Sequence, residues 1–126
     1  MEQTVYPSLE EALYLHDRLI DRFGGTAGVR DMGLLESAVG RARSGYYKTL
    51  TEQAAALMQS FAMNHAFVDG NKRMAFSMCA VFLRLNGHRL RVQASVAEDF
   101  LVEQVICNKA SVQEIAEWLT KYIVAV

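Results

Sequence analysis

The stretch from Met74 to Leu85 constrains the fold more than any other part of this sequence, because it is apolar almost throughout. A helix that is hydrophobic on nearly every side has to be enclosed by other elements of the protein. The pair Asn86-Gly87 follows the stretch and is a typical signal for the end of a helix. We therefore predict a central, buried helix that starts at Asn71 or Lys72 and ends at Asn86-Gly87.

Four Ser/Thr-x-x-Glu patterns indicate that the surrounding elements are also helices. In a capping box, the Ser or Thr and the Glu satisfy unpaired N–H groups at a helix start. Each of the four precedes an apolar period of helical spacing, and they are Ser8/Glu11, Thr49/Glu52, Ser95/Glu98 and Ser111/Glu114. Asp31 is a further expected N-cap. The patterns predict an all-α protein, a compact bundle in which residues 1–126 form one domain.

Composition and charge exclude several classes of protein. The chain has 126 residues, of which 52% are hydrophobic, and this is enough to form a core. A net charge of −1 provides no overall attraction to nucleic acid or to a membrane surface. The polar start Met1–Thr4 is unlike a signal peptide, and Cys79 and Cys107 lack metal-ligand spacing and are expected as reduced core thiols. We expect a cytoplasmic protein that binds neither nucleic acid nor membranes.

The first predicted helix, residues 9–23, has one apolar face that includes His16 and Phe23. Gly24-Gly25 supplies its C-cap and a turn. The glycine-rich segment lacks the Lys-Ser/Thr of a P-loop and follows a helix instead of a strand, so we do not interpret it as a nucleotide loop. For His16 we favour a hydrogen-bonded core histidine over a catalytic role.

Two segments outside the helices have alternative interpretations. Residues 41–48 form either a simple connection or a mobile flap over a site. Residues 88–92 are expected to be extended and, with Arg84, make a basic cluster that we interpret as a solvated surface in preference to a phosphate or partner contact. Two final helices are expected, with inward positions at Ala97, Phe100, Leu101 and Val105 in one and at Val112, Ile115, Leu119 and Ile123 in the other.

A polar segment, His65–Arg73, leads into the first turn of the central helix, and Phe67 within it is expected to be an apolar anchor. A helix start exposes unpaired N–H groups and the positive end of the helix dipole, so it attracts anions. Gly70 lets the backbone approach a ligand closely. Lys72 and Arg73 are unfavourable in a first helical turn unless a more negative group, such as a polyphosphate, is bound there.

The side chains of this loop suggest phosphoryl or nucleotidyl transfer. His65 can accept a proton near neutral pH. Asp69 offers a hard oxygen ligand for Mg²⁺ that already holds phosphates. Asn71 can donate to a phosphate oxygen, while Lys72 and Arg73 can neutralise phosphate charge. The alternative is a capped loop whose charges are solvated.

The whole segment His65-Ala66-Phe67-Val68-Asp69-Gly70-Asn71-Lys72-Arg73 resembles the signature of the Fic/Doc family in its Doc (death-on-curing) form. Further segments resemble Doc sequences in the same order, so the resemblance covers about residues 13–87. They are Leu15-His16-Asp17, Phe23-Gly24-Gly25, Gly28–Asp31, Gly33–Ala38 and Phe82–Gly87.

This resemblance implies a Fic fold and the toxin of a toxin–antitoxin pair, with ATP and Mg²⁺ as cofactors. The Doc type is a protein kinase that moves the γ-phosphate of ATP onto a Thr of a translation factor, elongation factor Tu. By this resemblance His65 is the base, Asp69 is the Mg²⁺ ligand, and the phosphate binders are Gly70, Asn71, Lys72 and Arg73. A flap that aligns the target would map onto Tyr46-Tyr47-Lys48.

The sequence departs from the Fic pattern at Lys72, where Fic members have Gly, and at Ala66, where they have Pro. No Glu is followed by Gly or Asn, so the self-inhibitory motif of many Fic proteins is missing from this sequence. That fits either a toxin silenced by a small antitoxin protein or an unregulated enzyme. The alternatives to a kinase are an AMP transferase and a catalytically inactive binding module, and Lys72 argues against the former.

Overall fold

The central element of the fold is helix α4, Asn71–Leu85, which lies beside helix α3, Leu50–Asn64. The computed structural model describes residues 3–126. The inward face of α4 is fully covered by its neighbours, and its buried residues are Met74, Ala75, Met78, Cys79, Phe82 and Leu83. The predicted enclosed central helix is therefore confirmed, with the start and end that the sequence indicated.

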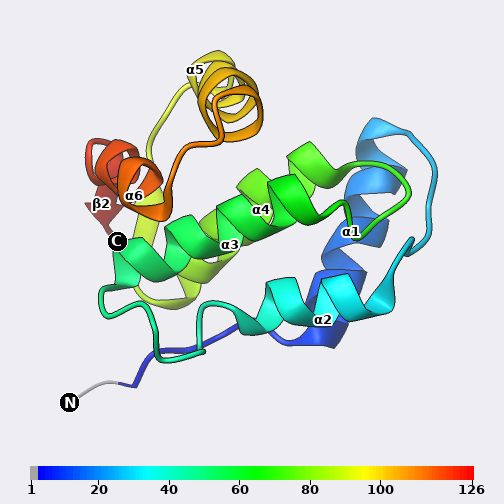
Figure 1. Ribbon diagram of the computed structural model, residues 1–126, viewed down its shortest axis with the longest axis horizontal. Coiled ribbons are helices and arrows are strands. Elements are labelled where there is room, and N and C mark those ends of the chain that lie inside the picture. Colours follow the sequence, from blue (N-terminus) through cyan, green and yellow to red (C-terminus); the bar gives the residue numbers. More distant parts are fainter. Residues whose placement is uncertain (1–2) are drawn as a thin grey trace.

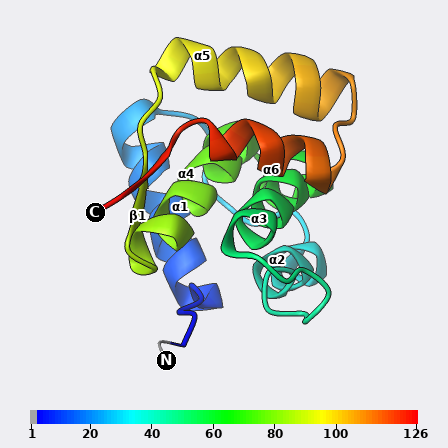
Figure 2. The same ribbon diagram turned by 90° about the vertical axis from the view of Figure 1, so that its left-hand side faces the viewer.

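The other helices cover the α3–α4 pair from two sides (Figure 1). Helices α1, Leu9–Phe23, and α2, Met32–Gly40, lie on one side. On the other side lie α5, Ala94–Asp99, its π-helical continuation η1, Phe100–Cys107, and α6, Val112–Thr120, as Figure 2 shows from a second direction. The protein is a mostly helical bundle, as the capping patterns predicted.

Three of the four predicted capping boxes are present, at Ser8, Thr49 and Ser111. The fourth, at Ser95, is wrong. Helix α5 already begins at Ala94, because the N–H of Ala97 donates to the carbonyl of Gln93, and Ser95 therefore lies inside the first turn. Asp31 caps α2 as expected, and its carboxylate accepts from the N–H of Leu34 at 3.0 Å.

The extended piece predicted after α4 is strand β1, His88–Leu90, and it pairs antiparallel with β2, Ile123–Ala125. The prediction that Ile123 faces inward from the last helix is wrong. Helix α6 ends at Thr120, and the final residues run alongside β1, where Ile123 is the partner of Leu90. Only the tertiary structure brings that strand edge next to the end of the chain.

The two cysteines lie in different environments. Cys79 is buried in α4, and its burial raises the pKa of the thiol to about 12, so it stays protonated. Cys107 is exposed, which corrects the expectation of a core thiol, because it ends η1 beside an exposed loop. No helix within residues 3–126 is long and apolar enough to cross a bilayer. Of the polar chain start Met1–Thr4, Met1 and Glu2 lie outside the described residues.

Replacing Ser111 by Ala should lower the free energy of unfolding by about 1 kcal/mol, because the N–H of Glu114 loses its hydroxyl acceptor. The control is Ser95→Ala in α5, where no side-chain cap is present, and it should change that free energy by less than about 0.5 kcal/mol. Urea denaturation of both variants measures the difference. Equal losses would mean that Ser95 is a cap after all.

Candidate active site

The loop between α3 and α4 turns the chain through left-handed residues at each of its ends. His65 is the C-cap of α3 with φ 51°, and Gly70 is the N-cap of α4 with φ 78°. A left-handed conformation is uncommon for a residue with a side chain, so the surroundings have to hold His65 in place. Arg30 does so from outside the loop, since its guanidinium donates to the carbonyls of His65 at 2.6 Å and Asn64 at 3.1 Å.

The side chain of Asn71 closes the loop from within. Its oxygen accepts from the N–H of Phe67 at 3.1 Å, and its nitrogen donates to the carbonyl of Phe67 at 3.0 Å. The sequence suggested that this side chain donates to a phosphate oxygen. In the observed arrangement the side chain holds the loop, and the backbone N–H of Asn71 is the group offered to a ligand.

Two aromatic rings anchor the loop in the core. Phe67 is buried, as predicted, and its ring stacks on the imidazole of His16 with centroids 3.8 Å apart and planes within 6°. His16 is 2% exposed, and its Nε2 lies 2.8 Å from the carbonyl oxygen of Asp69. A carbonyl only accepts, so Nε2 carries the hydrogen and donates it. The predicted hydrogen-bonded core histidine is therefore confirmed.

The carboxylate of Asp69 is held ionised by backbone donors. One oxygen accepts from the N–H of Thr26 at 3.0 Å, and the other accepts from the N–H of Gly70 at 2.8 Å. These bonds, that of Thr26 first, hold the pKa of Asp69 below its ordinary value, with smaller help from Arg73 and His16. An ionised and exposed carboxylate is a suitable oxygen ligand for Mg²⁺.

The start of α4 presents unpaired donors. No side chain caps this helix, and its first backbone bond runs from the N–H of Met74 to the carbonyl of Gly70. The N–H groups of Asn71, Lys72 and Arg73 precede that bond and have no partner inside the helix. The side chains of Lys72 and Arg73 are exposed beside them. The helix start thus combines amide donors with two positive charges, which suits a phosphate chain.

A cavity of about 750 Å³ opens at this point and brings all of the predicted site residues together. Its polar end is lined by His65, Asp69, Gly70, Asn71, Lys72 and Arg73. The imidazole of His65 is exposed and makes no hydrogen bond to any of residues 3–126, so it is accessible to a substrate hydroxyl. The rest of the lining is mostly apolar and comes largely from α5 and η1, with Ala97, Leu101 and Ile106 among its residues.

A metal ion at this site would depend on few protein ligands. Among residues 3–126 no three His, Cys, Asp or Glu side chains cluster in a way that could hold a metal ion. Mg²⁺ in phosphate-transfer sites keeps several waters and is held by one or two carboxylates together with substrate phosphates. Asp69 beside the uncapped start of α4 fits that requirement.

The segment Gly24–Arg30 runs alongside the loop, and the sequence did not reveal this role. Val29 pairs with Phe67 in an antiparallel bridge, and the N–H of Val68 donates to the carbonyl of Gly28 at 3.1 Å. The N–H of Thr26 in this segment donates to the Asp69 carboxylate, and the guanidinium of Arg30 donates to the carbonyl of His65. The density of glycine in the segment was an available signal, because it indicates close approach of backbone to backbone, and parts of the segment also resemble Doc sequences.

Phe23 is another residue whose role the sequence did not reveal. It lies on the same face of the first helix as His16, as predicted, but the expectation that this position is packed in the apolar core is wrong, since its side chain is 54% exposed. Its position at the end of α1 carries the ring past the core and into the lining of the cavity. There the guanidinium carbon of Arg73 lies 4.5 Å from the centroid of the ring.

The flap predicted at Tyr46-Tyr47-Lys48 does not lie over this cavity, and the prediction is corrected. These residues precede the start of α3, whereas His65 follows its end, and a helix of 15 residues is about 22 Å long. Figure 1 shows the two loops at opposite ends of α3. Arg41 instead ties the segment down, donating to the hydroxyls of Tyr47 at 2.6 Å and Ser60 at 2.9 Å.

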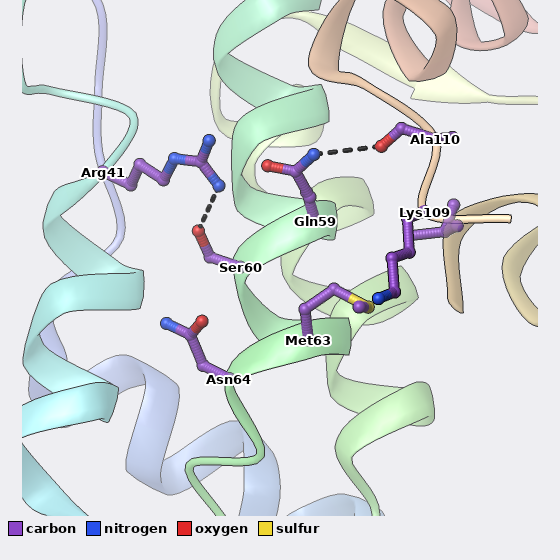
Figure 3. A pocket seen from close by; sticks show the side chains of 8 residues that line it. Arg41, Gln59, Ser60, Met63, Asn64, Lys109 and Ala110 are labelled. Atoms are coloured by element: carbon purple, nitrogen blue, oxygen red, sulfur yellow. Dashed lines mark hydrogen bonds between the residues drawn. The ribbon is translucent and has the colours of Figure 1, made fainter. Parts of the chain in front are cut away.

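Arg41 also lines a second cavity, of about 250 Å³, on the flank of α3 (Figure 3). Lys109 and Ala110 form the opposite wall, and the side chain of Gln59 donates to the carbonyl of Ala110 at 3.0 Å. No residue of the loop His65–Gly70 and no carboxylate lines this cavity. It therefore contributes nothing to the chemistry described above.

The fold and the site together define a helical domain with an uncapped helix start, an ionised carboxylate and an accessible imidazole in one cavity. The family model described as "Fic/DOC family" matches residues 6–83, and the chain belongs to the Fic/Doc family. "Toxin Doc" of Mycolicibacterium smegmatis is 42% identical over 110 residues, which is 82% of this chain and 84% of that protein. "Protein kinase doc" of Escherichia phage P1 is 35% identical over 118 residues, 90% of this chain and 92% of that protein.

Replacing Gly25 by Ala should raise the pKa of Asp69 back toward 3.8. A Cβ at Gly25 would lie 2.7 Å from the carboxylate, which has to move away from the N–H of Thr26. In the parent protein the lowered pKa means that stability gained from the carboxylate is present above pH 3.8 and is lost as the pH falls through the lower folded value. NMR titration of the Asp69 carboxyl carbon measures the shift.

The matched control is Gly24→Ala. Gly24 also has a positive φ, 83° against 115° at Gly25, but a Cβ there would meet nothing within 4 Å. Both variants carry backbone strain, so a difference between them isolates the contact with Asp69. A pKa for Asp69 that is equally low in both variants would contradict the assignment of Thr26 as its main donor.

Proposed function

We propose that this protein is a Doc-type toxin, a protein kinase that transfers the γ-phosphate of ATP to a Ser or Thr hydroxyl of a translation factor. The observation that carries the proposal is the shared cavity, in which His65, the ionised Asp69 and the unpaired amides at the start of α4 face one space. The names of the two relatives, a toxin and a protein kinase, support the same class of activity.

In the proposed reaction His65 takes the proton of the acceptor hydroxyl while that oxygen attacks the γ-phosphorus. The bond from the γ-phosphorus to its bridging oxygen breaks, and ADP leaves with the electron pair. The backbone N–H groups of Asn71, Lys72 and Arg73 in the first turn of α4, with the side chains of Lys72 and Arg73, stabilise the negative charge on the phosphate oxygens. The N–H of Gly70, expected from the sequence to bind phosphate, donates to the Asp69 carboxylate instead. Mg²⁺ held by Asp69 would supply further positive charge at the phosphates.

Control of this activity is proposed to come from a small antitoxin protein. No Glu in the chain is followed by Gly or Asn, so the sequence lacks the motif with which many Fic proteins inhibit themselves. We further propose that the target is aligned by Gly24–Arg30, because this exposed segment lies next to the loop that carries His65 and Asp69.

When the protein is incubated with bacterial lysate, label from γ-labelled ATP should appear on a protein target, and label from α-labelled ATP should not. Replacing His65 by Ala removes the proton acceptor and should lower the transfer rate by at least about a hundredfold. The same variant should no longer arrest growth. Transfer of the α label alone would instead identify an AMP transferase, and undiminished growth arrest by His65→Ala would identify a binding module.

Lys72 is expected to favour γ-phosphate transfer, because it places a long cationic side chain where Fic members have Gly. Replacing Lys72 by Gly should therefore reduce γ-label transfer and allow α-label transfer onto the target. The control is Lys72→Arg, which keeps the charge and should keep the γ specificity. Unchanged γ transfer in Lys72→Gly would show that this position does not set the orientation of ATP.

A further inference from the structure

One stripe of helix α1 touches the site residues in order. His16, Ile20 and Phe23 are spaced four and three residues apart, so they lie on one face of the helix. His16 meets the carbonyl of Asp69, and Phe23 meets the guanidinium of Arg73. Ile20 lies between them, where its Cδ1 is 3.5 Å from a Cβ built on Gly70. The order along α1 thus matches the order along the loop and the start of α4.

The contact made by His16 holds the backbone of Asp69 and thereby positions its carboxylate. The donated hydrogen bond of 2.8 Å holds the Asp69 carbonyl, and the stacked ring holds Phe67 two residues earlier. A Cβ built on Gly70 would lie 3.4 Å from Nε2 of His16, so the loop has little room to shift toward α1. The imidazole is 2% exposed and is separated from solvent, so it does not touch a ligand itself.

The contact made by Phe23 leaves the donors of Arg73 free. A phenyl ring carries no lone pair for a conventional hydrogen bond, so its cation–π contact with Arg73 occupies none of the oxygen or nitrogen acceptors that the guanidinium could use. The ring of Phe23 can therefore hold Arg73 without using the N–H groups that a phosphate would accept from. Arg22 lies 5.4 Å from the same ring, so the ring places two guanidinium groups at the end of α1.

We propose that His16 and Phe23 are positioning residues for the phosphate site, His16 through Asp69 and Phe23 through Arg73. This inference rests on the proposed binding of ATP with Mg²⁺. The two residues act on different partners, so their loss has different consequences. Loss of the His16 donor affects the metal ligand and hence only binding that depends on Mg²⁺. Loss of the Phe23 ring affects an arginine that contacts phosphate with or without the metal.

The experiment measures the affinity for ATP by calorimetry, once with Mg²⁺ and once with EDTA, on the parent protein and on variants of His16 and Phe23. His16→Phe keeps a stacking ring and removes the donor, and it should weaken binding about tenfold in Mg²⁺ and leave binding in EDTA unchanged. His16→Gln restores an N–H donor near the position of Nε2 and should bind within about twofold of the parent. The role of His16 is overturned if the His16→Phe variant binds ATP as tightly as the parent in Mg²⁺, or if its affinity falls by the same factor in EDTA as in Mg²⁺.

For the second residue, Phe23→Leu should weaken binding about fivefold in both buffers, and Phe23→Tyr should bind within about twofold of the parent. In a background of Arg73→Ala, Phe23→Leu should cause no further loss, because the interaction is already gone. If Phe23→Leu weakens ATP binding by about another fivefold in the Arg73→Ala background, the role of Phe23 is overturned. The exposed ring of Phe23 can be changed without disturbing the core. If His16→Phe fails to fold, the Phe23 variants therefore still test the proposal.

A matched control lies on the outer face of the same helix. Tyr14 is 65% exposed and pairs with Arg18, whose guanidinium carbon is 5.9 Å from its ring, away from the cavity. Tyr14→Leu should leave ATP affinity unchanged, and a loss equal to that of Phe23→Leu would overturn the specific role of Phe23. If the parent protein itself binds no ATP, the proposed function fails. If the parent binds and all variants bind equally, only the positioning roles fail.

Discussion

The first backbone N–H groups of helix α4 are left without a side-chain cap, and the structure around α4 is arranged so that they stay uncapped. Most helices satisfy those groups with a side-chain cap, and α1, α3 and α6 of this protein do so. Helix α4 has Gly70 at its N-cap and no side-chain cap. The loop before α4 therefore has to be held by residues that do not use the amides of the first turn.

The holding contacts come from elements far away in the sequence. The guanidinium of Arg30 donates hydrogen bonds to the carbonyls at the end of α3. The imidazole of His16 donates to the carbonyl of Asp69, and the N–H of Thr26 donates to the carboxylate of Asp69. Each of these contacts satisfies a polar group of the loop that would otherwise compete for the start of α4. These contacts give the loop a defined shape and lower the pKa of Asp69. They also leave the backbone N–H groups in the first turn of α4 without a side-chain cap.

The charges at the start of α4 run against the preference of an isolated helix. Lys72 and Arg73 stand at the positive end of the dipole, where cations are unfavourable. Asp69 is the one acidic side chain within the described residues that accepts hydrogen bonds in this loop. Local rules that fail at one place in an otherwise consistent sequence commonly mark a functional site, and here the failure coincides with the cavity.

The sequence by itself determined the helical class, the enclosed central helix and the group of six candidate site residues that line one cavity, because each depends on neighbours in the chain. Capping boxes, apolar periods and a nine-residue signature are local patterns. The strand partner of Leu90, the exposure of Phe23 and the segment beside the loop were decided only by the tertiary structure. Those features depend on which surfaces meet after folding, and contacts across tens of residues leave no periodic trace in the sequence.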